Sequence, residues 1–217
     1  MAYRAVLFDM DGTVLNTLED LYNAVNRSLA EFALPEVTRE QVRAALGNGA
    51  ARLIAACVPA GTDPALTERV LAWYKPWYDA HCRVFTAPYP GILPLMERLR
   101  AQGLRLAIIS NKPDGAVREL AAAFFPGLLD AAVGESPAVQ RKPNPDAVLA
   151  AARQMGLSPA ECLYVGDSEV DVATARNAAM PCAAVSWGFR SREQLLAAGA
   201  PFIAETAEEL AAFIENN

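Results

Sequence analysis

Histidine and lysine are scarce in this chain of 217 residues. His81 is its only histidine, and Lys75, Lys112 and Lys142 are its only lysines. A single histidine excludes catalytic schemes that need two histidines, and it excludes a Ser-His-Asp triad built on a histidine elsewhere in the chain. We interpret His81 as a structural residue. Two of the three lysines lie in short polar motifs, and this concentration indicates a specific role.

Cysteine is also sparse and follows no ligand pattern. No two cysteines form a Cys-x-x-Cys pair, and none is followed six residues later by arginine, the spacing of the cysteine-phosphatase loop. The sequence therefore excludes that phosphatase class, and it has no His/Cys cluster suited to zinc. Scattered cysteines are typical of reduced thiols in a cytosolic protein. The four cysteines are Cys57, Cys82, Cys162 and Cys182.

Long apolar runs and an excess of positive charge are absent as well. No apolar stretch is long enough to cross a bilayer without charge. The apolar run that starts at residue 5 leaves no room for a signal peptide, so we expect a cytoplasmic protein. The net charge of −6 and the isoelectric point near 4.9 disfavour general binding to nucleic acids or anionic membranes. An acidic protein that acts on phosphate must concentrate positive charge locally or bind a metal ion.

The chain does contain enough apolar residues for a sizeable core, arranged as short runs separated by helical stretches. It is 53% apolar and 20% charged, with a mean hydropathy of +0.14, which excludes a disordered chain. Strands that alternate with helices predict an α/β fold with a parallel sheet, and such sheets gather functional groups at the carboxyl ends of their strands. The apolar runs cover residues 5–8, 104–109, 131–133, 162–165 and 182–185.

Residues 15–83 interrupt this alternation, because they contain helical patterns but no convincing strand. Leu21, Val25 and Leu29 share one apolar face of the first pattern. A segment rich in turn residues, 85–91, marks the return of the chain. We predict a core domain formed by residues 1–14 and 84–217, and a helical cap domain, 15–83, that acts as a lid over the end of the first strand. The expected cap helices cover roughly 17–33, 39–46, 49–57 and 64–80.

The most informative motif follows the first apolar run, where Asp-Met-Asp-Gly-Thr occupies positions 9–13. Residues i and i+2 of a strand point the same way, so Asp9 and Asp11 are expected to share one side. Gly12 allows a sharp turn that leaves backbone N–H groups facing an anion, and Thr13 adds a hydroxyl. Two carboxylates, amide donors and a hydroxyl at the mouth of a sheet are what a metal-assisted phosphoryl transfer through an aspartyl intermediate needs.

Three further polar motifs follow along the chain, at positions 110–112, 141–146 and 166–171. Each alone has an ordinary explanation as a helix cap, a solvated or loop-capping lysine, or a turn. All four motifs together indicate a phosphoryl-transfer site. The pattern Gly-x4-Gly-Lys-Ser/Thr is absent, so a P-loop for ATP is unsupported. The chemically informative residues of the three motifs are Ser110, Asn111, Lys112, Lys142, Asp167 and Asp171.

With these four motifs in this order, the sequence resembles the haloacid dehalogenase superfamily of phosphohydrolases, in the version with a helical cap after the first strand. The resemblance covers essentially the whole chain, and its later motifs are most similar to those of phosphoglycolate phosphatases. It implies a Rossmann-like parallel sheet. It also implies that Asp9 is the nucleophile that forms a phospho-aspartate, and that Asp11 first protonates the leaving oxygen and then activates water. Asn16 stands where many members have an acid, and we interpret it as a hinge variant.

The resemblance also implies a set of ligands around the two carboxylates. A carboxylate that attacks a phosphate dianion needs a hard cation to offset the repulsion, and oxygen ligands suit Mg²⁺. The expected Mg²⁺ ligands are Asp9, the backbone carbonyl of Asp11, and Asp167, with Asp171 in support. The expected phosphoryl-binding residues are Ser110 and Lys142, accompanied by Gly12, Thr13 and Asn111.

The cap is expected to choose the leaving group, because the core reads only phosphate. Gly47-Asn48-Gly49 lies between two expected cap helices, and Arg52 follows it. The turn and this arginine could read a small carboxylate such as that of glycolate; the alternative is an ordinary turn with a solvated arginine. On the first interpretation the best substrate is 2-phosphoglycolate, and the partner is a small phosphorylated metabolite.

Other functions on the same core stay open at this point. They include a pyrophosphatase, a phosphatase for sugar phosphates or nucleotides, and a β-phosphoglucomutase, although Gly47-Asn48-Gly49 does not resemble the basic cap loop of such mutases. A phosphonatase would need a cap lysine, and Lys75 beside Pro76 is a poor candidate. A non-catalytic regulatory protein would be expected to have lost one of the four motifs, and none is lost. The sequence is compatible with a monomer or a homodimer.

Overall fold

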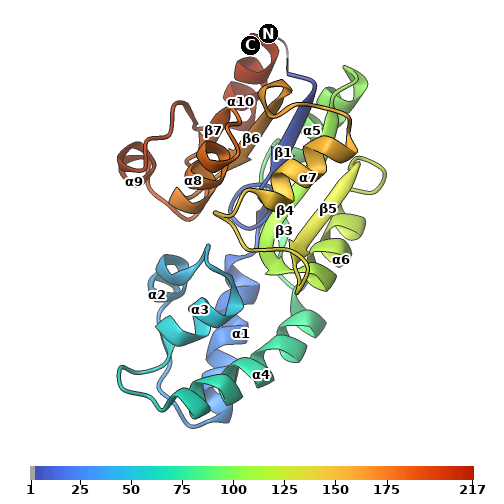
Figure 1. Ribbon diagram of the computed structural model, residues 1–217. Coiled ribbons are helices and arrows are strands. Elements are labelled where there is room, and N and C mark those ends of the chain that lie inside the picture. Colours follow the sequence, from blue (N-terminus) through green and yellow to red (C-terminus); the bar gives the residue numbers. More distant parts are fainter. Residues whose placement is uncertain (1–2) are drawn as a thin grey trace.

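The computed structural model describes residues 3–217 and has two parts, a parallel sheet enclosed by helices and a separate group of helices below it (Figure 1). The sheet has six strands in the order β5-β4-β1-β6-β7-β8, and every neighbouring pair is parallel. This is the α/β fold that the alternating pattern predicts. The strands are β1 (Ala5–Phe8), β4 (Arg105–Pro113), β5 (Ala131–Glu135), β6 (Cys162–Gly166), β7 (Cys182–Val185) and β8 (Ile203–Ala204).

Two strands differ from the sequence expectation. Strand β4 continues past its apolar run as far as Pro113, which pairs with Glu135 of β5 after a shift in register. The edge strand β8 is absent from the expected runs, because two residues show no recognisable period. The extension of β4 matters for the site, since it carries residues 110–113 beyond the apolar part of the sheet and toward the cap.

Two helical layers cover the faces of the sheet, and alternation along the strands decides which residue meets which layer. On β1, Val6 and Phe8 belong to one apolar core, whereas Ala5 and Leu7 belong to the other. All four are buried, which explains why this run is apolar throughout. Helices α5 (Ile92–Ala101), α6 (Asp114–Phe124) and α10 (Ala207–Glu215) pack on the first face, and α7 (Asp146–Gln154) and α8 (Glu169–Asn177) on the second. The short helices η1 (Pro159–Glu161) and α9 (Arg192–Ala197) lie in connections between later strands.

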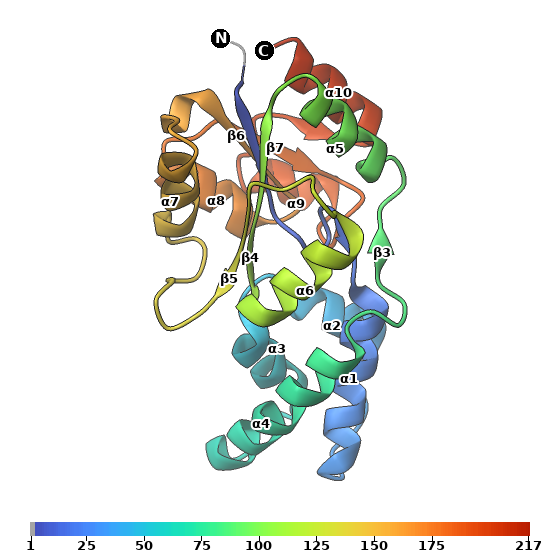
Figure 2. The ribbon, with the colours of Figure 1, turned by 90° about the vertical axis from the view of Figure 1, so that its right-hand side faces the viewer.

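The helices α1 to α4 pack on one another and form the cap (Figures 1 and 2). Two of them begin with ordinary capping signals. Thr38 accepts a hydrogen bond from the N–H of Gln41 in a capping box, and Asp63 caps a helix that has Pro64 in its first turn. The cap helices are α1 (Leu18–Glu31), α2 (Arg39–Ala45), α3 (Gly49–Cys57) and α4 (Pro64–His81), close to the expected ranges.

Two chain segments join the cap to the core, and they pair with each other as a short antiparallel ribbon. The buried Asp20 carboxylate on α1 accepts hydrogen bonds from the N–H groups of Phe85 and Thr86 and from the Thr86 hydroxyl. The ribbon departs from the purely helical pattern expected after residue 14. We keep 15–83 as the proposed cap domain, with this ribbon as its boundary on both sides. The ribbon consists of β2 (Leu15–Asn16) and β3 (Ala87–Pro88).

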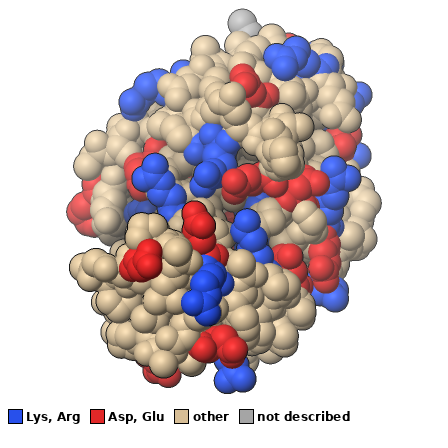
Figure 3. Space-filling view, turned by 60° about the horizontal axis from the view of Figure 1, so that its bottom comes forward, with Lys and Arg blue, Asp and Glu red and all other residues tan. Residues whose placement is uncertain are grey.

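The surface on the cap side mixes charges of both signs. Lysine, arginine and acidic side chains lie next to one another, mostly across the middle of the view in Figure 3. This face therefore presents no continuous basic surface of the kind that nucleic acids bind. Among residues 3–217, no helix combines the length and the apolar character that crossing a membrane requires.

Candidate active site

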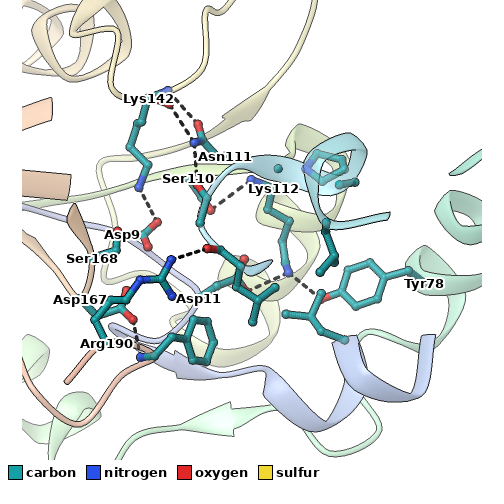
Figure 4. A pocket seen from close by; sticks show the side chains of 18 of the residues that line it. Asp9, Asp11, Tyr78, Ser110, Asn111, Lys112, Lys142, Asp167, Ser168 and Arg190 are labelled. Carbon is teal, nitrogen blue, oxygen red and sulfur yellow. Dashed lines mark hydrogen bonds and ion pairs between the residues drawn. The ribbon is translucent and has the colours of Figure 1, made fainter. Parts of the chain in front are cut away.

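The carboxyl ends of β1, β4 and β6 meet beside the cap, at the point where the strand order changes direction. Asp9 and Asp167 directly follow β1 and β6, and Ser110 lies in the last part of β4. They line a cavity of about 60 Å³ together with residues of the cap helices (Figure 4). The cavity therefore lies between the core and the cap, at the sheet edge where the four motifs are expected to meet.

The segment after β1 turns back sharply. Three successive N–H groups, those of residues 13–15, donate to the carbonyl of Met10. Gly12 has a φ of +86°, and a Cβ at this position would lie 2.3 Å from Oδ2 of Asp167. The Thr13 hydroxyl donates to Oδ1 of the same carboxylate at 3.4 Å. The turn thus brings the first and the last motif into contact.

Lys142 connects the acidic groups of these motifs. Its Nζ lies 2.7 Å from Oδ1 of Asp9 and 2.8 Å from Oδ1 of Asp171, and it donates to the Tyr164 hydroxyl at 3.0 Å. Burial by itself would lower the pKa of Lys142, but the two carboxylates raise it well above its usual value. The ammonium group is therefore charged and can offset negative charge on a phosphoryl group.

Asp9, Asp167 and Asp171 form a buried cluster in which one carboxylate oxygen of each lies within 4.8 Å of the others. Burial raises the pKa of Asp9 to about 7, against the effect of Lys142. Burial and the charge of Asp171 raise the pKa of Asp167 well above its usual value. A hard divalent cation would offset the repulsion among these carboxylates. The donor set, which is made of oxygen atoms, therefore fits Mg²⁺.

Two glycines let the backbone approach this cluster. A Cβ at Gly166 would lie 2.2 Å from Cγ of Asp171, and one at Gly188 would lie 2.4 Å from Oδ2 of Asp167. The N–H of Phe189, the next residue along the chain, donates to Oδ2 of Asp167 at 2.6 Å. The loop after β7 is thus part of the acidic site.

The Asp11 carboxylate lies outside the acidic cluster and faces a different cation. Its Oδ1 is 2.8 Å from Nζ of Lys112, whose side chain is only 3% exposed. Lys112 also donates to the hydroxyl of Tyr78, on cap helix α4, at 2.5 Å (Figure 4). A core lysine therefore links Asp11 to the cap. This arrangement is compatible with Asp11 offering only its backbone carbonyl to a metal ion while its carboxylate transfers a proton.

Residues 6–185 match the family of haloacid dehalogenase-like hydrolases. The chain belongs to this family. It is 36% identical over 207 residues to phosphoglycolate phosphatase of Rhodospirillum rubrum, covering 91% of this chain and 85% of the relative. It is 35% identical over 196 residues to phosphoglycolate phosphatase of Pseudomonas putida, covering 86% and 70%.

Solved structures share the haloacid dehalogenase-like fold. The crystal structure of a candidate phosphoglycolate phosphatase from Lactobacillus delbrueckii subsp. bulgaricus is 37% identical, covers 100% of both chains and has a TM-score of 0.95. A mutant of CbbY from Rhodobacter sphaeroides, in complex with xylulose-(1,5)bisphosphate, is 25% identical, covers 96% of both chains and has a TM-score of 0.80. The family, the fold class and the enzymatic nature expected from the sequence are thereby confirmed.

In this hydrolase, most of the expected site residues lie at the cavity, but Arg52 does not. Arg52 is exposed on α3, whereas its neighbour Leu53 is buried and lines the cavity. Successive helical residues point about 100° apart, so the rotation of α3 decides which of the two faces inward. The structure gives Arg52 no place in the cavity, and we do not retain it in the proposed site. The expected residues that line the cavity are Asp9, Asp11, Ser110, Asn111, Lys142 and Asp167, with Gly12, Thr13 and Asp171 beside them.

The Asn111 amide joins three parts of the site. Its Nδ2 donates to the carbonyls of Gly47 and Lys142, at 2.9 and 3.0 Å, and its Oδ1 accepts from the N–H of Lys142 at 2.8 Å. Its contacts therefore position the Lys142 segment and the glycine turn of the cap. Ser110 and Lys142 are left as the expected phosphoryl-binding side chains of these motifs.

Tyr78 and Arg190 line the cavity, but the sequence did not predict them as site residues. Arg190 pairs with Glu169 at 2.8 Å and donates to the carbonyl of Leu46 in the cap at 2.8 Å. Neither residue lies in one of the four motifs. Tyr74 and Tyr78 share a helix face, but that spacing predicts a buried face rather than a site. Only the approach of the cap to the core gives these residues a place at the cavity.

Proposed function

We propose that this phosphatase of the haloacid dehalogenase-like family uses Mg²⁺ and hydrolyses small phosphomonoesters through a phospho-aspartate on Asp9. The best substrate is 2-phosphoglycolate. One observation carries the proposal: the buried Asp9 carboxylate lies 2.7 Å from Lys142, beside two further carboxylates, in a cavity under the cap. This arrangement combines a nucleophile, a phosphoryl-binding cation and the oxygen donors of a metal site.

In the first step, a carboxylate oxygen of Asp9 attacks phosphorus, and the bond between phosphorus and the leaving oxygen breaks. The Lys142 ammonium group and the Ser110 hydroxyl bind the other phosphoryl oxygens, on which charge develops. Asp171 and Tyr164 fix the position of the Lys142 Nζ. The cation is therefore in place before the substrate arrives, and little reorganisation is needed during the reaction.

Asp11 moves the proton in both steps. It donates a proton to the leaving oxygen as the first bond breaks, and it then accepts a proton from the water that attacks the phospho-aspartate. The ion pair with Lys112 fixes one of its carboxylate oxygens. The cap encloses the cavity during these steps and so limits access of bulk water to the reacting groups.

Asp9, Asp167 and the backbone carbonyl of Asp11 would hold Mg²⁺, with Asp171 in support. When bound, the ion offsets the repulsion between the Asp9 carboxylate and the phosphate dianion. The N–H of Phe189 orients the Asp167 carboxylate for this role. The raised pKa values of the acidic groups support the proposal, because a cation would favour their ionised forms.

The choice of 2-phosphoglycolate is supported by the relatives and by the cavity. The proteins from Rhodospirillum rubrum and Pseudomonas putida are named phosphoglycolate phosphatases. Apolar cap side chains such as Leu21, Leu46 and Leu53 line the cavity and favour a leaving group with few polar atoms. A sugar phosphate is the second candidate, favoured by the similar fold of CbbY with its bound xylulose-(1,5)bisphosphate.

We further propose that the enzyme acts on a free metabolite in the cytoplasm, as a monomer or a homodimer, without a nucleic-acid or membrane partner. All four cysteines are free, which is typical of a reducing compartment. The acidic net charge and the mixed charges of the face in Figure 3 also favour a small-molecule partner.

Phosphate release tests the proposed function. The wild type would be assayed on 2-phosphoglycolate, pyrophosphate, a sugar phosphate and a nucleoside monophosphate, with Mg²⁺ and with EDTA. We expect 2-phosphoglycolate to be hydrolysed fastest, and we expect EDTA or Asp9→Asn to abolish turnover. Asp63→Asn changes an exposed carboxylate at the start of α4 and should retain the full rate. Similar slow turnover of all esters would remove the substrate assignment, and no turnover of any ester would contradict the proposed function.

A further inference from the structure

We propose that Lys112 of the core and Tyr78 of the cap together bind a carboxylate on the leaving group of the substrate. This inference rests on the proposed phosphatase function and adds the residues that would recognise the leaving group of a hydroxy-acid phosphate. Both residues line the cavity, Lys112 from strand β4 of the core and Tyr78 from helix α4 of the cap, and they meet each other there (Figure 4). The site is therefore complete only when the cap meets the core.

Both side chains have a hydrogen-bond donor to spare. The Lys112 ammonium group has three N–H donors, and its described acceptors are Oδ1 of Asp11 and the hydroxyl of Tyr78. Because Tyr78 accepts this bond, its own O–H proton remains, and within residues 3–217 it has no described acceptor. Burial raises the pKa of Tyr78 well above its usual value, so the proton stays on the hydroxyl. One N–H and one O–H can thus be offered to an anion in the cavity.

The charge around Lys112 favours an anionic ligand. The side chain is 3% exposed, and Asp11 is its ion-pair partner among the described residues. A buried cation is costly unless it is paired. During catalysis Asp11 must also donate a proton to the leaving oxygen. Its carboxylate is then not available to Lys112 alone. In 2-phosphoglycolate a single carbon separates the ester oxygen from the carboxylate, which places a second anion within reach of the lysine that touches Asp11.

The other cations near the cavity are already engaged. Lys142 pairs with Asp9 and Asp171. Arg190 pairs with Glu169 through two nitrogens, at 2.8 and 3.1 Å, and donates to the carbonyl of Leu46 as well. Lys112 also pairs with Asp11, but it contacts one carboxylate and keeps one N–H donor, so it is the cation of the cavity best placed to receive a further carboxylate.

The remaining cap side chains around the cavity are mostly apolar, and they include Leu21, Leu46 and Leu53. Such a wall suits the methylene group of a small hydroxy acid. It offers no polar partners to the several hydroxyls of a sugar, which would be desolvated without compensation. The combination of one anion-binding pair and an apolar wall therefore selects a short, carboxylate-bearing leaving group.

Binding of two non-hydrolysable analogues tests the inference. 3-Phosphonopropionate has the shape of 2-phosphoglycolate and keeps its carboxylate, whereas propylphosphonate replaces the carboxylate with a methyl group. We expect the wild type to bind the first analogue more tightly, by about 10- to 100-fold in inhibition constant. Lys112→Met should abolish this preference, and Tyr78→Phe should reduce it by several-fold. The same pattern should appear in kcat/KM for 2-phosphoglycolate against ethyl phosphate.

Two matched variants serve as controls, and both should keep the wild-type preference. Lys75→Met removes an exposed cap lysine, and Tyr22→Phe removes a cap hydroxyl outside the cavity. If Lys112→Met weakens both analogues equally, Lys112 only positions Asp11 and the inference is wrong. If the wild type hydrolyses ethyl phosphate as fast as 2-phosphoglycolate, the inference also fails while the phosphatase function stands. Absence of phosphate release from every ester would instead refute the proposed function itself, and the inference with it.

Discussion

The two ends of the cavity are built in different ways. At one end, which we call the phosphoryl end, Lys142 contacts side chains of the core: Asp9, Asp171 and Tyr164. At the other, the leaving-group end, Lys112 contacts Asp11 of the core and Tyr78 of the cap. The first end is complete within the core, whereas the second requires both parts of the molecule.

This difference matches the proposed tasks of the two ends. Stabilising charge on a phosphoryl group requires donors that are fixed before the reaction, and a packed sheet edge provides them. Recognition of a leaving group can depend on closure of the cap over the core. A ligand that contacts both parts stabilises the closed arrangement. Under the proposed function, the core therefore carries the chemistry and the cap contributes selection.

The largest effect is expected from Lys142→Met, at the phosphoryl end. The variant should lose turnover by about 10³-fold or more. In EDTA it should also lose about 3 kcal/mol of unfolding free energy, because the buried carboxylates of Asp9 and Asp171 lose their cation. Mg²⁺ should restore part of this loss. Urea denaturation with and without Mg²⁺ measures it, with Lys75→Met as the control; unchanged stability in EDTA would show that the acidic cluster does not depend on Lys142.

A smaller but clear loss is expected from Gly188→Ala, which disturbs the backbone around Asp167. The new Cβ would lie 2.4 Å from the carbonyl oxygen of Gly12 and from the Asp167 carboxylate, so one of them must shift. We expect a loss of about 1–3 kcal/mol in stability and weaker Mg²⁺ binding. Gly115→Ala is the matched control, because a Cβ at Gly115 meets nothing within 4 Å. Equal behaviour of the two variants in thermal unfolding and Mg²⁺ titration would argue against a role of this loop.

The pH dependence of Mg²⁺ binding tests whether the carboxylates at the phosphoryl end hold the metal ion. The pKa of Asp9 is raised to about 7 in the folded protein, from a usual value of 3.8. Ionisation of Asp9 therefore costs stability in EDTA as the pH rises toward 7, whereas Mg²⁺ binds the ionised form. Below pH 7 we expect Mg²⁺ affinity to fall by at least about tenfold per pH unit, because Asp9 must release a proton to bind the ion and the raised pKa of Asp167 adds to the slope. Calorimetric titration between pH 5.5 and 8 measures this slope, which Asp9→Asn should reduce; a pH-independent affinity of the wild type would contradict the proposed ligand set.

The smallest effect is expected where the cap rests on the core. Arg43 on α2 donates to the carbonyls of Gly188 and Phe189, at 2.6 and 3.0 Å. Arg43→Met should reduce kcat/KM by about 3- to 10-fold through a less stable closed state. Arg27→Met, on the exposed side of α1, should leave kcat/KM unchanged. If Arg43→Met reduced Mg²⁺ affinity as much as kcat/KM, the contact of the cap with the core would also control the metal site. The phosphoryl end and the leaving-group end would then not act independently.

Much of the fold was readable from local patterns. The five apolar runs became strands β1, β4, β5, β6 and β7, because short apolar segments between helices have few other places in an α/β fold. The cap helices lie near their expected positions for a similar reason, since their apolar faces repeat with the helical period. The two-residue strands β2 and β8 were not readable, because pairing with distant segments defines them.

The residues of the candidate site also fall into two groups, those whose position follows from the sequence and those whose position depends on tertiary packing. Asp9 and Asp167 follow two of the neighbouring parallel strands, and Ser110 lies near the end of a third, so their meeting at one edge of the sheet is a consequence of sequence position alone. The inward turn of Leu53 in place of Arg52, and the contact between Tyr78 and Lys112, depend on how the cap helices rotate and where they dock. The sequence by itself thus determined the family, the sheet and the carboxylates that we propose as catalytic. Tertiary packing decided which side chains face the leaving group, because the orientation of one domain against another arises from contacts between residues far apart in the chain.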